Sequence, residues 1–329
     1  MSFRISPLWW PVLAVASPVL IPWLLVRNRR FQRGCVQAAE RNGERINGAE
    51  PLELPEVEFL ELTVLVEWKA REGFIGDAGV SYLLKTDLGS MLFDIGFGAT
   101  RPAFTHNAAK LGFTLDQVEA LTISHLHQDH MGGTRAQFSR QVAVPEEWMP
   151  SGPVPCFLPD RAEAEGFEAQ RVTKPQFLAA GFASTGPLAR SLFLLGTTEE
   201  QALVIRVKDK GLVVFTGCGH PTIEVILEMV GRLSKEPLYA LGGGLHFPVT
   251  GGRDTRAGIQ LQAIVGTGKP PWRRITDEDL SPTISAINVA APRKVYLSAH
   301  DTCDHSLDRM VRELTAETEV LEAGASFRL

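Results

Sequence analysis

Three histidines and one aspartate follow a short apolar segment at a spacing that suits metal binding. The segment Ala120–Ser124 leads directly into His125, His127, Asp129 and His130. In an extended backbone, residues i and i+2 point to the same side, so the first two histidines can hold one cation, and the turn that follows directs the other two side chains to a second position. Imidazole and carboxylate groups bind Zn and also Fe or Mn. The segment therefore predicts a metal site.

Three further histidines follow apolar segments that we predict to be strands. They are His220 after Leu212–Thr216, His246 after Leu238–Leu241, and His300 after Lys294–Ser298. Functional side chains are often carried on the loops that follow such strands, and a first-row metal needs three or four protein ligands. We therefore expect these histidines near the first cluster. His106 and His305 lack this context and are expected at the surface or in packing.

The composition is that of a globular protein without a surface for nucleic acid. The chain has 329 residues, of which 44% are hydrophobic and 22% charged, and this excludes a disordered chain or a coiled coil. The net charge is −5, and the first 33 residues carry five arginines and no acid, which leaves −10 for the rest. An acidic body lacks the basic surface that phosphate backbones need, so we expect no nucleic-acid partner. Four cysteines are too few for a disulfide scaffold.

Strands and helices are intermixed along the body of the chain, which is typical of sheets covered by helices. We predict strands at Leu60–Val66, Val80–Leu84, Met91–Phe93, Ala120–Ser124, Ala202–Val207, Leu212–Thr216, Leu238–Leu241 and Lys294–Ser298, with short strands near Val320 and Phe327. We predict helices at Asn107–Leu111, Thr222–Leu233 and Ser306–Leu314. Residues 145–187 and 248–279 are irregular, and long irregular segments of this kind are usually functional loops. In the second loop, Arg253, Arg256 and Lys269 either meet an anionic substrate or are solvated.

An uncharged stretch near the N-terminus has the length of a membrane-spanning helix. Residues 7–26 contain no charged side chain, and at about 1.5 Å per residue they match a hydrocarbon core of roughly 30 Å. Four arginines follow the stretch and only Arg4 precedes it, so the positive-inside rule places the rest of the chain in the cytoplasm. We expect residues 1–33 to be a membrane anchor with a basic flank.

Two alternatives to the anchor remain open. One is a cleaved signal peptide, because Ala14-Val15-Ala16 resembles a small-residue cleavage site, and it would lead to a secreted or periplasmic protein. The other is a buried hairpin, because four prolines interrupt the stretch. The polar residues 34–56 are predicted to be a linker, and residues 57–329 form the remaining domain.

The pattern HxHxDH at residues 125–130 resembles the signature of the metallo-β-lactamase superfamily. Other motifs resemble the branch named for 7,8-dihydropterin-6-methyl-4-(ribofuranosyl)aminobenzene-phosphate synthase. These motifs are Ser81-Tyr-Leu-Leu, Met91-Leu-Phe-Asp94-Ile-Gly96, Asn107-Ala-Ala-Lys-Leu-Gly112, Gly217-Cys-Gly-His220 and Gly243-Gly-Leu-His246. The resemblance covers residues 57–329. It implies an αββα sandwich of two mixed β-sheets with a binuclear metal site at one edge, here preceded by the N-terminal membrane helix.

The resemblance also implies two sets of metal ligands. The first metal is assigned to His125, His127 and His220, and the second to Asp129, His130 and His300. The family usually takes one ligand from a separate histidine that this chain lacks, because no histidine lies between residues 130 and 220, and His220 is the natural replacement. Cys218 stands where many members have a bridging aspartate, and it is either a ligand or a buried thiol. Asp94 is expected either to accept a hydrogen bond from a ligand imidazole or to be a turn residue.

From these residues we predict a binuclear-metal-dependent hydrolase that acts on a small molecule, with an anionic substrate as one possibility. A hydroxide that bridges two divalent ions would attack an ester, lactone or phosphoester bond, and the ions would be Zn, with Fe or Mn as alternatives. Asp129 would orient the hydroxide. His246 would hydrogen-bond the substrate or donate a proton, or else serve packing. The alternative functions are a transferase that joins a dihydropterin diphosphate to an aminobenzene ribofuranosyl phosphate, and an Fe-dependent oxidoreductase.

Overall fold

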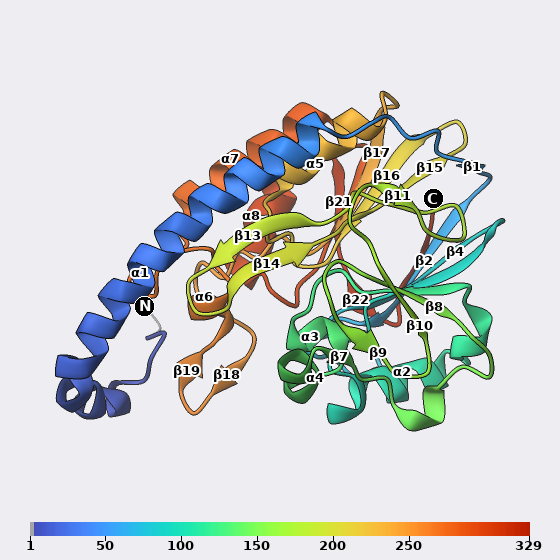
Figure 1. Cartoon of the computed structure of the whole chain (residues 1–329). Coiled ribbons are helices and arrows are strands. Elements are labelled where there is room, and N and C mark those ends of the chain that lie inside the picture. The colour runs from blue at the N-terminus through green and yellow to red at the C-terminus, as the bar shows by residue number, and fades with distance from the viewer. Residues whose placement is uncertain (1–2) are drawn as a thin grey trace.

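Two β-sheets lie face to face, and helices cover the outer surface of each (Figure 1). The structure is a computed structural model that describes residues 3–329. The first sheet has the order β11 (Gln176–Phe177), β12 (Ala183–Ser184), β15 (Leu203–Val207), β16 (Gly211–Thr216), β17 (Leu238–Gly243), β20 (Lys294–Leu297) and β21 (Glu317–Val320), and β1 (Glu56–Val57) pairs with β15. The strands from β16 to β21 are parallel, and β15 is antiparallel to β16.

The second sheet is also mixed. Its order is β10 (Glu168–Arg171), β8 (Pro155–Leu158), β6 (Ala120–Thr122), β5 (Gly89–Phe93), β4 (Ser81–Thr86), β2 (Leu60–Val66) and β23 (Ser326–Arg328). The four strands from β10 to β5 are parallel, and the remaining pairs are antiparallel. Four two-stranded pairs complete the strands: β3 (Lys69–Ala70) with β22 (Glu322–Ala323), β7 (Gln141–Val142) with β9 (Glu163–Ala164), β13 (Leu188–Leu192) with β14 (Gly196–Glu200), and β18 (Thr255–Arg256) with β19 (Ile259–Gln260).

The apolar side chains divide into three layers, as the αββα architecture requires. The strands alternate, so that Leu62 and Val64 of β2 pack against Val213 and Phe215 of β16 between the sheets. Outside the first sheet lie α5 (Ile223–Leu233), α7 (Asp277–Ala290) and α8 (Asp304–Glu313). Outside the second lie α2 (Ala103–Lys110), α3 (Gln128–Met131) and α4 (Thr134–Ser139). The predicted αββα sandwich of two mixed sheets is confirmed.

Helix α1 (Trp10–Asn47) is a long N-terminal helix that continues through Pro18 and Pro22. A turn of 3₁₀ helix, Pro7–Trp9, precedes it. The part of α1 with the highest hydropathy is long and apolar enough to cross a membrane, and none of it is buried. The buried hairpin that we considered is therefore wrong, because the prolines are accommodated within one exposed helix.

Residues 34–47, which we expected within a linker, also belong to α1. Polar contacts fix this part of the helix to the body: the Asn42 side chain donates to the Ala189 carbonyl and accepts from the Ala189 N–H, and Arg45 pairs with Glu199 at 2.6 Å. Ile46 is buried in the core beneath α5. Specific polar contacts, and not an apolar face, hold this segment against the body. A helix was therefore not predicted from the pattern of hydrophobic residues.

Most predicted elements are present with shifts of a few residues at their ends, but several elements were not predicted, among them the strands β8 to β12 within the segment 145–187 that we predicted to be irregular. Helix α7 begins at Asp277, at the end of the segment 248–279 that we predicted to be irregular, and was not predicted. The same region also holds α6 (Gln262–Val265) and the β18–β19 hairpin. The β13–β14 hairpin lies within a region without a clear alternation of apolar residues, and the short turn between its strands is Phe193–Leu195.

Candidate metal centre

The carboxyl ends of parallel strands from both sheets meet at one edge of the sandwich, and the predicted ligands lie there. The loop after β6 carries residues 125–130, the loop after β16 carries Cys218 and His220, and the loops after β17 and β20 carry His246 and His300. Parallel strands present their ends on the same side, which is why segments distant in sequence converge here.

His125, His127 and His220 form the first group of donor side chains. Their ring nitrogens lie within 4.8 Å of one another. His220 Nε2 is 3.1 Å from His127 Nδ1, and the rings of His125 and His127 stand nearly perpendicular, with centroids 4.4 Å apart. This group has the members that the family resemblance implies for the first metal.

Asp129, His130, Cys218 and His300 form the second group, and their donor atoms also lie within 4.8 Å of one another. Cys218 Sγ is 3.2 Å from His130 Nε2 and 3.2 Å from His300 Nε2. The thiol therefore faces the other donors and is not packed away among apolar side chains.

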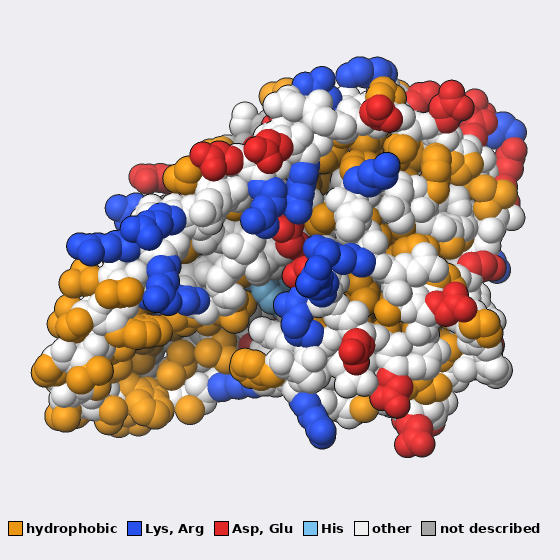
Figure 2. Space-filling model, viewed as in Figure 1, with side chains coloured by type: hydrophobic (Ala, Val, Ile, Leu, Met, Phe, Trp, Pro, Cys, Tyr) orange, Lys and Arg blue, Asp and Glu red, His pale blue; other side chains and the backbone are white. Residues whose placement is uncertain are grey.

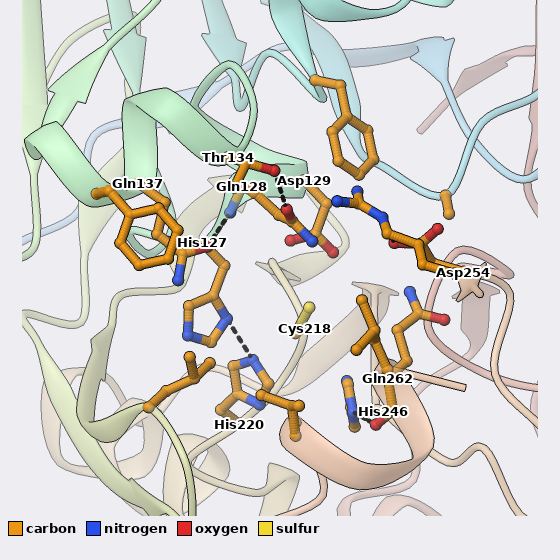
Figure 3. A pocket seen from close by; sticks show the side chains of 18 residues that line it. His127, Gln128, Asp129, Thr134, Gln137, Cys218, His220, His246, Asp254 and Gln262 are labelled. Atoms are coloured by element: carbon orange, nitrogen blue, oxygen red, sulfur yellow. Dashed lines mark hydrogen bonds and ion pairs between the residues drawn. The ribbon is translucent and has the colours of Figure 1, made fainter. Parts of the chain in front are cut away.

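Cys218 also belongs to a third group with His220 and His246, so its sulfur is shared by the second and third groups. Figure 3 shows these three side chains at the cavity. The structure thus brings together every residue that we predicted from the sequence as a ligand or catalytic group. His106 and His305 are exposed and lie outside these groups, as expected.

Asp94 orients one of these imidazoles and the strand end beneath it. His130 Nδ1–H donates to Asp94 Oδ2 at 2.7 Å, and the Ser124 N–H and hydroxyl donate to the same carboxylate at 2.7 Å each. Hydrogen bonds of this kind fix the tautomer and ring orientation of a ligand histidine. The predicted role of Asp94 as an imidazole partner is confirmed.

A second buried carboxylate, Glu67, acts on His300 through a serine and was not predicted. It accepts hydrogen bonds from the Ser298 hydroxyl, from Tyr82 Oη at 2.6 Å and from the Ala299 N–H at 3.1 Å. The Ser298 Oγ is in turn 2.6 Å from His300 Nδ1. Burial raises the pKa of Glu67 to about 7 despite these hydrogen bonds.

Glu200 organises the loop that carries Cys218 and His220, and it was also missed. Its carboxylate accepts from the N–H groups of Gly217 at 3.1 Å, Gly219 at 2.8 Å and His220 at 2.8 Å. Burial raises the pKa of Glu200 to about 7, while the hydrogen bonds act in the opposite direction. Neither Glu67 nor Glu200 belongs to a motif, so only their contacts across the fold reveal them.

Two glycines allow this loop to approach the first group. A Cβ at Gly217 would lie 2.2 Å from Ser124 Oγ and 3.1 Å from His125 Nδ1, so a side chain there would displace Ser124 and crowd the ligand His125. Gly219 has φ +66°, in the left-handed region that glycine adopts without strain. The Gly-Cys-Gly-His motif is therefore explained by packing as well as by chemistry.

The protonation states favour cation binding at the first group. Burial lowers the pKa of His125 and His220 well below the usual range, and it lowers that of His127 to about 3, so these rings are neutral and carry free lone pairs. His125 Nε2 is buried without a hydrogen-bond partner among the described residues. An unpaired buried nitrogen is costly, and a metal ion would satisfy it.

The second group carries negative charge next to a cationic imidazole. Burial alone would lower the pKa of His130, but the charges of Asp94 and Asp129 raise it to about 9. Burial raises the pKa of Asp129 and raises that of the Cys218 thiol far more. A divalent ion bound here would reverse this balance, because it displaces protons from thiol and imidazole ligands. The donor set of both groups fits Zn, and imidazole and carboxylate also suit Fe or Mn.

A cavity of about 300 Å³ opens above the donor groups (Figure 3). His127, Asp129, Cys218, His220 and His246 reach it from the floor. Its walls combine apolar side chains, from Ala78, Phe97, Phe138, Leu195, Leu261 and Val265, with polar ones, from Gln128, Thr134, Gln137, Asp254, Arg256 and Gln262. The site can therefore hold a substrate with a polar reacting group and an apolar remainder.

A second cavity, of about 170 Å³, shares His220 and His246 with the first and contains Arg190. The Arg190 guanidinium is packed over Gly268, and none of the described residues gives it a hydrogen bond or ion pair. Burial lowers the pKa of Arg190, while the charges of nearby groups including Glu224 oppose this shift. Arg190 is partly buried, and a partly buried cation without a paired anion is suited to bind an anionic group of a substrate.

The loop charges that we considered for an anionic substrate have other partners. Arg253 donates to the carbonyls of Ala299 and Thr302 and pairs with Asp304 at 2.9 Å. Arg256 pairs with Asp254, and Lys269 pairs with Asp279. All three residues have partners within the protein, but Arg256 also lines the first cavity and Lys269 lines the second, beside Arg190, which the sequence pattern did not indicate.

The chain has the metallo-β-lactamase fold. The family model of the metallo-β-lactamase superfamily matches residues 75–232, which include the segment from His125 to His130 and the loop with Cys218 and His220. Together with the two facing sheets and the ligand positions, this match supports the metallo-β-lactamase superfamily for this chain. No curated protein matches the sequence.

Solved structures with the same fold share little sequence with this chain. One is a metal-dependent hydrolase of the β-lactamase superfamily, with a TM-score of 0.56, 21% identity, and coverage of 82% of this chain and 98% of the other. Another is the metallo-β-lactamase fold protein YhfI from Bacillus subtilis, with a TM-score of 0.50, 14% identity, and coverage of 83% and 100%. At these identities the likeness establishes the fold alone.

Proposed function

We propose that this protein is a metal-dependent hydrolase that binds two divalent ions and cleaves an ester, lactone or phosphoester bond. One observation carries the proposal: seven donor side chains form two compact groups, and four of them, His127, Asp129, Cys218 and His220, line the floor of one cavity. His125, His127 and His220 would hold one ion, and Asp129, His130, Cys218 and His300 the other. When bound, such ions supply a nucleophile derived from water at neutral pH and polarise the substrate oxygen.

The remaining residues position the substrate and the proton that is exchanged. Asp129 reaches the cavity and can accept a hydrogen bond from the attacking water. His246 Nε2–H donates to the Gln262 carbonyl at 3.3 Å, and burial lowers the pKa of this ring to about 4, so we assign His246 to hydrogen bonding as a neutral imidazole. Arg190 would bind an anionic group in the adjoining cavity, which favours a phosphoester or a carboxylate-bearing substrate.

The attachment to a membrane is a separate part of the proposal. The exposed apolar part of α1, followed by Arg27, Arg29, Arg30 and Arg33, supports a body held at a membrane by residues 1–33, and the positive-inside rule places that body in the cytoplasm if the helix spans the bilayer. The branch named for the dihydropterin transferase also remains a proposal, supported by the motifs around Asp94 and His220.

The test is metal content and hydrolysis of the full-length protein in detergent. We expect two equivalents of Zn per chain, and hydrolysis of at least one of a carboxyl ester, a lactone and a phosphodiester that is lost on chelation and restored by Zn. His127→Ala should lose metal and activity. His106→Ala, which removes an exposed histidine outside the groups, is the matched control. Unchanged metal content and activity in His127→Ala would overturn the site.

The same preparation separates the alternatives. Release of pyrophosphate from a dihydropterin diphosphate in the presence of the aminobenzene acceptor, without hydrolysis of any ester, would assign a transferase. Iron in place of zinc, with redox activity, would assign an oxidoreductase.

A further inference from the structure

The N-terminal half of α1 carries an apolar surface that the body of the protein does not cover. The stretch from residue 7 to residue 26 has no charge, and Val15 on it is 84% exposed. Figure 2 shows hydrophobic side chains gathered over this part of the molecule, with Lys and Arg side chains beside them. Soluble proteins rarely expose an apolar surface of this size. The four arginines from Arg27 to Arg33 complement anionic headgroups, so a lipid bilayer is the partner that fits this surface.

Both ends of the apolar stretch are fastened to the same body. At one end, the Arg27 guanidinium donates to the carbonyls of Phe193 and Leu194 at 2.7 Å each. At the other end, Arg4 donates to the carbonyls of Ala263, Pro271 and Arg273. A spanning helix would separate its ends by a hydrocarbon core of roughly 30 Å, with a water-soluble body on one side only.

Further contacts bind the N-terminal end to the β18–β19 hairpin. The Ser6 N–H donates to the Gly258 carbonyl and the Gln260 N–H to the Arg4 carbonyl, both at 2.9 Å, and Trp9 Nε1 donates to the Ala257 carbonyl at 2.8 Å. The segment around this hairpin carries Arg253, Asp254, Arg256, Lys269, Arg273 and Arg274. A spanning α1 would bring these charges to the depth of the hydrocarbon, so the contacts favour a helix that lies in the plane of the membrane surface.

The two body segments fastened in this way are the walls of the site cavity. Leu195 follows Leu194 in the β13–β14 turn and lines the cavity. Leu261 and Val265 follow the β18–β19 hairpin and line it from the other side. The mouth of the cavity therefore lies beside the apolar surface of α1, and it carries exposed apolar side chains, with Phe138 82% exposed and Leu195 41% exposed, next to the polar lining residue Arg256.

We propose that the substrate is a membrane-resident amphiphile, which enters the cavity from a bilayer against which the apolar half of α1 lies in plane. Its ester or phosphoester group would reach the donor side chains on the floor, while its apolar chain would lie along Phe138 and Leu195 toward the membrane. This inference rests on the proposed hydrolase function and adds to it the class of substrate and the direction of entry.

The orientation is tested by a fluorophore at the mouth. Leu195→Cys in a Cys35→Ser background is labelled and mixed with vesicles of phosphatidylcholine and phosphatidylglycerol that carry brominated acyl chains. We expect strong quenching at position 195 and little at position 289. The Val289→Cys label is the matched control, because Val289 is 83% exposed and precedes β20, so it lies at the opposite end of the strand from His300. Equal quenching at the two positions would overturn the orientation.

The substrate class is tested with two substrates that share the scissile bond. One is short-chained and water-soluble, and the other has long acyl chains and is presented in vesicles. We expect kcat/KM to be at least about tenfold higher for the long-chain substrate. Phe138→Asp should lower this ratio about tenfold, whereas Val289→Asp should leave it unchanged. A ratio near one in the unmodified protein would overturn the inference.

These readouts separate the failure of this inference from that of the hydrolase proposal. Metal-dependent hydrolysis of the short-chain substrate without quenching or chain-length preference would leave the hydrolase and remove the amphiphile. Quenching at position 195 without hydrolysis of any substrate would leave the orientation and remove the hydrolase. If the protein isolated from its own cell proves to lack residues 1–26 through proteolytic cleavage, the inference would also be overturned. The apolar surface that binds the membrane would then be absent from the mature protein.

Discussion

The floor and the mouth of the cavity are built in different ways. The floor consists of side chains at the ends of strands from both sheets, and buried carboxylates such as Asp94 and Glu200 hold them through hydrogen bonds. The mouth includes Phe138 of α4 and two hairpin segments outside the sheets, and the N-terminal residues hold these two segments through hydrogen bonds to backbone carbonyls. The comparison shows that the two sheets determine the positions of the donor side chains. The N-terminal segment affects only the mouth of the cavity, so it could change without altering the floor.

The largest expected effect lies at the floor. His125→Ala removes a ligand whose Nε2 is buried and has no partner among the described residues. We expect loss of bound metal and a fall in kcat/KM of more than about 100-fold, beyond what the loss of a supporting hydrogen bond produces. Metal analysis and steady-state kinetics test this prediction, with whichever of the carboxyl ester, the lactone and the phosphodiester the protein hydrolyses. His305→Ala, at an exposed histidine, is the control. Retained metal would mean that the two donor groups are not ion sites.

A supporting carboxylate should have a smaller effect than a ligand. Asp94→Asn keeps the shape of the side chain but weakens the hydrogen bonds from His130 and Ser124. We expect metal affinity to fall about 10- to 100-fold, measured by competition with a chromophoric chelator. Asp308→Asn, at an exposed position on α8, should not change the affinity. Equal affinities in the two variants would show that the floor is held by its ligands alone.

The adjoining cavity should affect substrate binding rather than metal binding. Arg190→Gln removes the partly buried guanidinium, and we expect KM for an anionic substrate to rise about tenfold while the metal content stays the same. A neutral substrate with the same scissile bond should show no change in KM. Arg312→Gln, on the exposed face of α8, is the control. If both substrates are affected equally, Arg190 has a structural role only.

The smallest expected effect lies at the mouth. Arg27→Gln removes the hydrogen bonds to the Phe193 and Leu194 carbonyls, and we expect the free energy of unfolding in urea to fall by about 1 kcal/mol. Metal content should be unchanged, because no donor side chain is touched. Arg29→Gln, which alters an exposed arginine on the same helix, should be neutral. Loss of metal in Arg27→Gln would contradict the separation of floor and mouth.

The floor could be predicted from the sequence because its ligands are local or follow clear strands. His125 to His130 lie within six residues, and His220 and His300 each follow an apolar segment with strand character. Glu67, Glu200 and Arg190 could not be predicted, since each is isolated in the sequence and acquires its role from contacts with distant segments. Their environments depend on how the sheets and hairpins pack, which no local pattern encodes.

The helices show the same limit of local patterns. Helix α5 has an apolar face and was predicted, whereas the polar part of α1 is held by the hydrogen bonds of Asn42 and Arg45 to distant strands. Helix α7 did carry a local signal, because Thr276 and Asp279 form a capping box at its start. This pair indicates a helix that begins at the end of the Gly-rich loop.

The contacts of Arg4 have a consequence for the order of events during synthesis. The Ala263 carbonyl that Arg4 binds is 259 residues further along the chain. The apolar N-terminal segment therefore leaves the ribosome long before the residues that hydrogen-bond to it have been synthesised. During that interval the segment can bind a lipid surface or a targeting factor. The mouth of the cavity is completed only when translation is nearly finished.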